Sequence, residues 1–242
     1  MSASVIGGRL AALSKPYVMR TCLLALSLLL TFTLAYGKGY GRYDPQRLLT
    51  ISETPSGKRY GVDEAYLDRM LNDLALHAKN YPPRFDTPQD RQRAIRDVRI
   101  LSGMFDILIS GPAANTGLLA RAGLLNSIGY NLNIAGSAEK TTAIFQRLLA
   151  AAPSDPQGNY RYGMFLAEAG KPKEALPFLE KALAAGVTNA AYTLGMTYLA
   201  LGDKQNALNN LEIYSQHRPS DGNAARIIDA IRNGKVKIKH SH

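Results

Sequence analysis

Apolar residues recur at helical spacing along much of the chain that follows residue 62. The first stripe begins after Asp63 and consists of Ala65, Leu67, Met70, Leu71, Leu74 and Leu76. The second begins after Thr87 and consists of Ile95, Val98, Leu101, Phe105 and Leu108. Asp63 and Thr87 are residue types that cap helix N-termini, and prolines follow each stripe. The pattern predicts an N-terminal helical hairpin over residues 62–112.

Helical spacing is absent between residues 38 and 61, where Gly, Tyr, Pro and Ser are frequent. The apolar run in this segment is Leu48-Leu49-Thr50-Ile51. A short apolar run bounded by turn residues is typical of a strand, and turn residues themselves are typical of connections. We therefore expect residues 38–61 to form a linker with one short strand.

Between residues 113 and 234, a pattern of apolar and small residues occurs three times with the same internal offsets. The first copy comprises Leu125, Ile128, Gly129, Leu132, Thr141, Phe145 and Pro153. The second comprises Asn159, Tyr162, Gly163, Leu166, Ala175, Leu179 and Val187. The third comprises Ala191, Leu194, Gly195, Tyr198, Ala207, Leu211 and Pro219. A second glycine follows the first by seven residues in each copy, at Gly136, Gly170 and Gly202.

This pattern resembles that of the tetratricopeptide repeat family, in which each unit of about 34 residues is a helix, a turn and a second helix. The resemblance implies an all-α, superhelical array of antiparallel helix pairs, here with about three repeats. The glycines agree with it, because a small residue lets two helices pack closely and a glycine readily ends a helix in a left-handed conformation. The alternative is an ordinary α-helical bundle in which the spacing is coincidental.

We expect one further helix to cover the end of the array. It would start at Ser220-Asp221, carry Ala224, Ile227, Ile228 and Ile231 on one face, and end at Asn233-Gly234. Repeat arrays need such a terminal helix to shield their last apolar surface. The repeats and this capping helix together span residues 113–234, and residues 235–242 form a basic tail.

Residues 1–37 have the features of an export signal. Arg9, Lys15 and Arg20 come first without any acidic residue, and the 17 uncharged residues 21–37 follow. This order is typical of a secretory signal peptide, with cleavage after Gly37 or, as second choice, after Ala35. The sequence leaves open whether the chain starts at Met1 or at Met19. The alternative is an uncleaved anchor associated with the inner membrane through residues 21–37, a run slightly shorter than a spanning helix requires. We expect an exported bacterial protein, either periplasmic or anchored in the inner membrane facing the periplasm.

The net charge favours acidic partners. The full chain has 29 Lys and Arg against 19 Asp and Glu, a net charge of +10. Loss of residues 1–37 would remove three basic residues and leave 26 against 19, a net charge of +7. A basic protein attracts polyanions and anionic surfaces. Export disfavours nucleic acid as a partner, so we expect a protein or peptide, or alternatively an envelope polymer.

The sequence contains no arrangement typical of a catalytic or metal site. Cys22 is the single cysteine and lies in the apolar run, so neither a disulfide nor a cysteine metal site is expected in the folded part. The histidines are His77, His217, His240 and His242. Their spacing matches no recognisable metal or catalytic motif, and no nucleophile or phosphate-binding motif is present. We predict a non-enzymatic protein without cofactor or metal.

The resemblance also implies where a partner would bind. In arrays of this type the first helix of each unit lines a concave groove, and the residues expected there are Asn126, Tyr130, Asn133, Tyr160, Met164, Tyr192 and Met196. Tyrosine, asparagine and methionine suit an extended peptide or a partner helix. Family members that bind acidic C-termini carry a clamp of lysine, asparagine and arginine, which Tyr130 and Tyr160 do not reproduce. The alternative is that these side chains pack against neighbouring helices or are covered by residues 38–61.

A second candidate surface is the helix after Thr87, which carries Arg91, Arg93, Arg96 and Arg99. It could bind anions, and the alternative is a solvated helix face partly neutralised by Asp90 and Asp97. Taken together, the sequence predicts an exported protein–protein interaction scaffold for assembly of a bacterial envelope or secretion structure. The alternative function is binding of a polyanion or envelope polymer through the basic surface.

Overall fold

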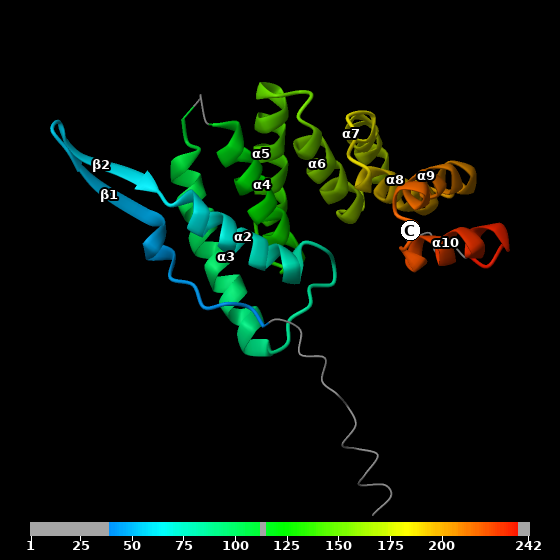
Figure 1. Ribbon diagram of the computed structural model, residues 1–242, viewed down its shortest axis with the longest axis horizontal. Coiled ribbons are helices and arrows are strands. Elements are labelled where there is room, and N and C mark those ends of the chain that lie inside the picture. The colour runs from blue at the N-terminus through cyan, green and yellow to red at the C-terminus, as the bar shows by residue number, and fades with distance from the viewer. Residues whose placement is uncertain (1–38, 112–114, 237–242) are drawn as a thin grey trace, which may run out of the picture. The chain divides into compact units, whose positions relative to one another are not determined.

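The computed structural model describes residues 39–111 and 115–236. The predicted signal peptide or anchor at residues 1–37 lies outside the described residues, as do residues 237–242 of the basic tail. The described part consists of a short 3-10 helix, a two-stranded sheet and nine α-helices, so the fold is all-α with a minor sheet (Figure 1). Among these helices, none combines the length and apolar content needed to cross a membrane.

Two helices follow the sheet, and both begin where their caps predict. In α2 (Glu64–Ala78), the Asp63 carboxylate accepts a hydrogen bond from the Tyr66 N–H at 2.9 Å. In α3 (Pro88–Leu108), the Thr87 hydroxyl accepts one from the Asp90 N–H at 3.1 Å. Each cap occupies one of the amide donors that have no partner within the helix, which fixes the helix start.

The repeat region forms three helix pairs. The pairs are α4 (Thr116–Asn131) with α5 (Ser137–Ala151), α6 (Pro156–Glu168) with α7 (Pro172–Ala184), and α8 (Asn189–Ala200) with α9 (Lys204–His217). Within each unit, the two helices pack mainly on each other. The second glycine of each unit has a positive φ, 77° at Gly136 and Gly170 and 86° at Gly202, as predicted for a residue between two helices.

The first glycine of each unit lies where the paired helices approach most closely. A Cβ on Gly163 would come within 2.7 Å of Leu179 Cγ, and one on Gly195 within 2.6 Å of Leu211 Cγ. At Gly129 the nearest atom would be Ser137 Oγ, at 2.6 Å. These distances are shorter than van der Waals contact, so the prediction of close helix packing at these glycines is confirmed.

The first helices of neighbouring units lie side by side. α4 contacts α6 and α6 contacts α8, whereas α5, α7 and α9 contact one another less. We call the surface formed by α4, α6 and α8 the first-helix face. α2 also lies along α4, because the Arg121 guanidinium donates to both Asp68 carboxylate oxygens at 2.7 and 2.9 Å and Asn131 Nδ2 donates to the Ala78 carbonyl at 3.1 Å.

The segment predicted to be a linker is instead an integral part of the fold. Residues 39–48, which we call the strap, include the 3-10 helix η1 (Pro45–Leu48) and contact both α2 and α3. Tyr40 is 3% exposed and Leu48 is fully buried, so both belong to the core. Because the strap lies between α2 and α3, these helices each pack on α4 more than on each other. The two helices of the predicted N-terminal hairpin therefore follow each other in the chain but contact each other mainly through the strap.

Hydrogen bonds connect the strap to both helices. The Tyr40 hydroxyl donates to Asp97 Oδ2 in α3 at 3.0 Å, and Arg93 Nη2 donates to the Tyr40 carbonyl at 3.0 Å. On the α2 side, the Gly41 N–H and the Tyr43 hydroxyl both donate to Asp73 Oδ2 at 2.8 Å. Buried carboxylates are costly unless they accept hydrogen bonds, so Asp73 and Asp97 depend on the strap.

The strap leads into a β-hairpin of β1 (Leu49–Thr54) and β2 (Gly57–Val62), where the sequence predicted one short strand. The strands pair antiparallel, with Leu49 opposite Val62 and Ile51 opposite Tyr60. Leu49 and Ile51 are 59% and 62% exposed, and Figure 1 shows the hairpin extending away from the helices.

The chain ends in the predicted capping helix, α10 (Gly222–Arg232). Its apolar face of Ile228 and Ile231 is buried in a small cluster with Leu199, Ala207 and Leu211 of the third unit. The cluster is separate from the main core, which runs from the strap to α8. α10 therefore covers apolar surface that the third unit would otherwise expose.

Candidate functional site

Four of the predicted groove residues are half-buried on the first-helix face, namely Tyr130, Tyr160, Met164 and Tyr192, and Met196 is 37% exposed. Two of the tyrosines mainly join neighbouring helices. The Tyr130 ring packs edge-on against Phe165 of α6 at 5.5 Å between centroids. The Tyr192 hydroxyl accepts a hydrogen bond from Asn223 of α10 at 3.0 Å, and its ring packs on Tyr214 at 5.1 Å. For Tyr130 and Tyr192, packing against neighbouring helices is thus observed.

Two predicted groove residues need correction. Asn126 is 1% exposed, because its Oδ1 accepts a hydrogen bond from Ser102 of α3 and its Nδ2 donates to the Ala122 carbonyl. Asn133 is exposed but follows the end of α4 with φ of 60°, so it belongs to the turn. The buried Asn126 contacts α3 rather than solvent, and the left-handed Asn133 ends the helix that was expected to present it.

Sequence analysis did not identify Arg161, a half-buried residue on α6. Its guanidinium makes no ion pair or side-chain hydrogen bond with any residue that the structure describes. Desolvation lowers the pKa of Arg161, and the negative charge of Asp155 opposes this effect only in part. A guanidinium has five N–H donors, and one that protein partly shields from water without offering acceptors is suited to bind an external acceptor.

The second residue that the sequence did not reveal is Glu168, at the C-terminal end of α6. Solvent reaches its side chain, yet the surrounding protein desolvates the carboxyl group and raises its pKa to about 7. A hydrogen bond with the Asn131 side chain lowers the pKa but does not compensate for desolvation. A carboxyl group with a pKa near neutrality changes its charge under physiological conditions.

Arg161, Met164 and Glu168 share one stripe of α6, because helical residues three, four and seven apart lie on the same side. Arg161 and Glu168 are two helical turns apart, or about 10 Å along the axis. Tyr160 borders the stripe toward α8, where the Thr193 hydroxyl interacts with it, and burial raises the pKa of its hydroxyl. We call Tyr160, Arg161, Met164 and Glu168 the α6 site.

The spacing of Arg161 and Glu168 relative to Gly163 could have revealed them. Both lie on the helix side that Met164 occupies, and Met164 was predicted to face the groove. Charged residues in an otherwise apolar and aromatic surface select partners by charge, because a like charge opposite them is strongly unfavourable. The α6 site thus offers a cation, a thioether, a phenol and a titratable carboxyl group within two helical turns.

The four arginines of α3 do not form a common anion-binding surface. Arg93 pairs with Asp90 and donates to the Tyr40 carbonyl, so it holds the strap. Arg96 pairs with the buried Asp97 at 3.3 Å. Arg91 is half-buried, and Arg99 is exposed without an ion-pair partner among the described residues. The prediction of a shared surface is corrected, because two of the four charges are neutralised within the fold.

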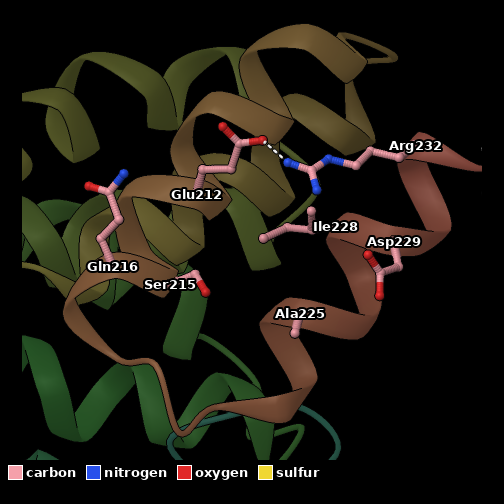
Figure 2. Close-up of a pocket in the computed structure, with 7 residues that line it drawn as sticks. All are labelled: Glu212, Ser215, Gln216, Ala225, Ile228, Asp229 and Arg232. Atoms are coloured by element: carbon pink, nitrogen blue, oxygen red, sulfur yellow. Dashed lines mark hydrogen bonds and ion pairs between the residues drawn. The ribbon is translucent and has the colours of Figure 1, made fainter.

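A hollow of about 480 Å³ lies between α9 and α10, lined by Glu212, Ser215, Gln216, Ala225, Ile228, Asp229 and Arg232. Figure 2 shows Arg232 reaching across it to Glu212, with which it forms an ion pair at 2.8 Å. The Arg232 charge is thereby compensated by Glu212, and the Asp229 carboxylate makes no ion pair among the described residues. Across the part of the chain that the structure describes, no group of three or more His, Cys, Asp and Glu residues is arranged to hold a metal ion.

Three solved structures resemble this fold. MamA matches with a TM-score of 0.51 and 17% identity, covering 62% of this chain and 86% of that one. TTC0263, a thermophilic tetratricopeptide repeat protein of Thermus thermophilus, has a TM-score of 0.48, 16% identity and coverage of 69% and 91%. YrrB, a tetratricopeptide repeat protein with an unusual peptide-binding site, has a TM-score of 0.39, 18% identity and coverage of 68% and 84%.

No family model matches the chain, and no curated protein matches it significantly. The similarity to MamA extends over most of that protein, and the helix pairs, packing glycines and capping helix follow the plan that the repeat pattern predicts. The chain therefore has a tetratricopeptide-like helical repeat fold.

Proposed function

We propose that this protein is a non-enzymatic protein–protein interaction scaffold that holds a segment of its partner on the first-helix face, at the α6 site. The observation that carries the proposal is that the half-buried guanidinium of Arg161 makes no ion pair or side-chain hydrogen bond among the described residues. Desolvating an unpaired charge destabilises a fold, so such a group is better explained by a ligand than by stability. Helical repeat proteins commonly use extended surfaces of this kind to bind other proteins.

The partner segment should be acidic or should end in a carboxylate where it meets Arg161. Carboxylates accept two parallel hydrogen bonds from a guanidinium, which gives both affinity and a fixed orientation. Next to it, Met164 and Tyr160 would contact apolar side chains of the partner, because a thioether adapts its shape and a phenol combines apolar area with a hydroxyl. The net positive charge of the chain would further favour an acidic partner.

The place of action that we propose is the bacterial cell envelope, where the scaffold would assist assembly of an envelope or secretion structure. Support comes from the sequence of residues 1–37, which has the order of charges, apolar residues and small residues of an export signal. Mass spectrometry of the mature N-terminus decides between cleavage and a retained anchor: a terminus at Lys38 means cleavage, and an intact terminus means an anchor. Polymer binding through α3 is less favoured, because Arg93 and Arg96 already have acidic partners.

Photo-crosslinking in the native envelope tests the proposed binding site. A photoreactive residue at Met164 should capture a defined protein, whereas the same residue at the exposed Gln205 of α9 is the matched control. Arg161→Gln, which breaks no ion pair of the fold, should weaken capture at Met164 about tenfold or more, as expected for loss of a charge-assisted hydrogen bond. Equal capture at both positions, or capture that Arg161→Gln does not change, would refute the proposal.

A further inference from the structure

A separate hollow of about 310 Å³ lies where α3 meets α4 and the start of α5. It contains none of the residues of the α6 site. Its polar lining includes the hydroxyls of Ser102 and Ser137 and the cationic groups of Arg99 and Lys140. Its apolar lining includes Val98, Ile134 and the open Cα of Gly103. No carboxylate lines it, so the hollow is basic on one side and apolar on the other.

The first turn of α5 borders this hollow. Its N-cap residue is Gly136, so no side chain caps the first turn. The N–H groups of Ala138 and Glu139 accordingly make no backbone hydrogen bond with any described residue, whereas those of Ser137 and Lys140 bond to Ile134 and Gly136. Free amides at a helix N-terminus, together with the positive end of the helix dipole, attract oxyanions.

Ser137 independently indicates a ligand. Its side chain is 4% exposed and its hydroxyl makes no hydrogen bond to any residue that the structure describes. Oγ lies over Gly129, where a Cβ would approach it to 2.6 Å, so a larger residue at position 129 would displace it. Ser137 lines the hollow, and a hydroxyl there without a partner in the fold can donate to a molecule bound in the hollow.

The two cationic side chains that line the hollow, Lys140 and Arg99, differ in the interactions that they make within the fold. Lys140 Nζ donates to Ser102 Oγ at 3.2 Å and also pairs with Asp106 of α3. Ser102 Oγ in turn donates to Asn126 Oδ1 at 3.0 Å, so Lys140 and Ser102 belong to a connected network. Arg99 has no such partner among the described residues and leaves an uncompensated positive charge at the hollow.

We propose that this hollow binds a small amphiphilic anion. Its oxyanion group, a phosphoryl group or a carboxylate, would accept hydrogen bonds from Ser137 Oγ and the first amides of α5, with Arg99 supplying the opposite charge. Its apolar part would lie against Val98 and Ile134. A volume of about 310 Å³ leaves room for an apolar part beside a phosphate-sized group. The bound anion would contact both α3 and α5 and would thereby link these two helices.

The test is a nuclear magnetic resonance titration of the full-length chain with inorganic phosphate, butyl phosphate and butyrate. The amide signals of Ala138 and Glu139 should shift and saturate with butyl phosphate or butyrate, and whichever binds more tightly identifies the oxyanion. Arg99→Gln and Ser137→Ala should each weaken binding about tenfold, as for loss of one hydrogen bond to a charged group. Arg91→Gln on the same helix is the matched control, because Arg91 does not line the hollow.

Three results would overturn the proposal. The first is the absence of saturable shifts with any of the three anions. The second is binding that Arg99→Gln leaves unchanged, since Arg99 is exposed and its replacement does not disturb the fold. The third is equal affinity for inorganic phosphate and butyl phosphate, which would exclude the apolar contact with Val98 and Ile134.

Discussion

At the scale of single residues, the first glycine of each repeat is required because the packed helices leave no room for a Cβ atom. Gly163 is replaceable only if α6 and α7 separate, because a Cβ would approach Leu179 Cγ to 2.7 Å and the Leu179 backbone nitrogen to 3.1 Å. The neighbouring backbone cannot adjust as a flexible side chain can. Gly103 in α3 is the opposite case, because a Cβ there would have no atom within 4 Å.

Gly163→Ala should therefore lower the free energy of unfolding. Alanine improves helix propensity by about 1 kcal/mol, but overpacking typically costs about 1–3 kcal/mol, so we expect a net loss of up to about 2 kcal/mol. Gly103→Ala is the matched control and should raise stability by up to about 1 kcal/mol, since only propensity changes. Urea denaturation measures both variants, and a stabilising Gly163→Ala would contradict the packing described here.

A second residue-scale prediction concerns Glu168 and pH. Its pKa is about 7 in the folded protein because of desolvation, above the ordinary value of 4.5. The folded state then binds the proton more tightly than the unfolded state, so this group makes stability fall as pH rises from about 4.5 to about 7. Glu168→Gln should remove this dependence, giving a higher melting temperature than wild type at pH 8 and the smallest difference below pH 4.5. A difference that does not depend on pH would show that Glu168 titrates normally.

At the scale of elements, the strap explains why α2 and α3 are not a regular repeat pair. The Tyr40 hydroxyl supplies a hydrogen bond to Asp97, a carboxylate with no exposed surface whose pKa is raised by burial. Arg96 is the other side-chain partner of Asp97, and its own side chain is 58% exposed. Tyr40 is thus the buried group that satisfies this carboxylate.

Tyr40→Phe should destabilise the protein by about 1–3 kcal/mol, because it leaves a buried acceptor without its donor while keeping the ring. Tyr81→Phe is the control, since Tyr81 is 65% exposed and makes no side-chain hydrogen bond among the described residues. Hydrogen exchange should show the loss of protection in α2 and α3. Equal effects of the two substitutions would mean that the strap hydroxyl does not hold these helices.

Some features of the fold could be predicted from the sequence, and others could not. The repeat units could be predicted because their glycines and apolar residues recur within about 34 residues. The strap could not, because Tyr40 and Asp97 are 57 residues apart and a stretch rich in Gly, Tyr and Pro also suits a linker. For Arg161 the repeat register could have placed the residue beside Met164, but a sequence does not show which cation makes no ion pair in the fold.

At the scale of the whole molecule, the array should unfold from its C-terminal end. The cluster of Leu199, Leu211, Ile228 and Ile231 joins α10 to the third unit and is separate from the main core. Repeat units depend mainly on their nearest neighbours, so damage at one end spreads only gradually.

Truncation after Asp221, which removes α10, should therefore lower hydrogen-exchange protection in α8 and α9 and leave α4 and α5 protected. Truncation after Val236 is the control, because Val236 still packs on the terminal cluster while the rest of the tail is lost. Uniform loss of protection along the chain would indicate that the array unfolds as one cooperative unit instead.

The strap also sets an order in time. Residues 39–48 leave the ribosome before the rest of the fold, but the acceptor for Tyr40 is in α3, 57 residues later. Contacts within each helix pair are local and can form as the chain emerges, whereas the Tyr40 hydroxyl has no acceptor until α3 is complete. The part of the fold that is made first is thus fully held only after α3 has been made. During that interval, other proteins can reach the strap.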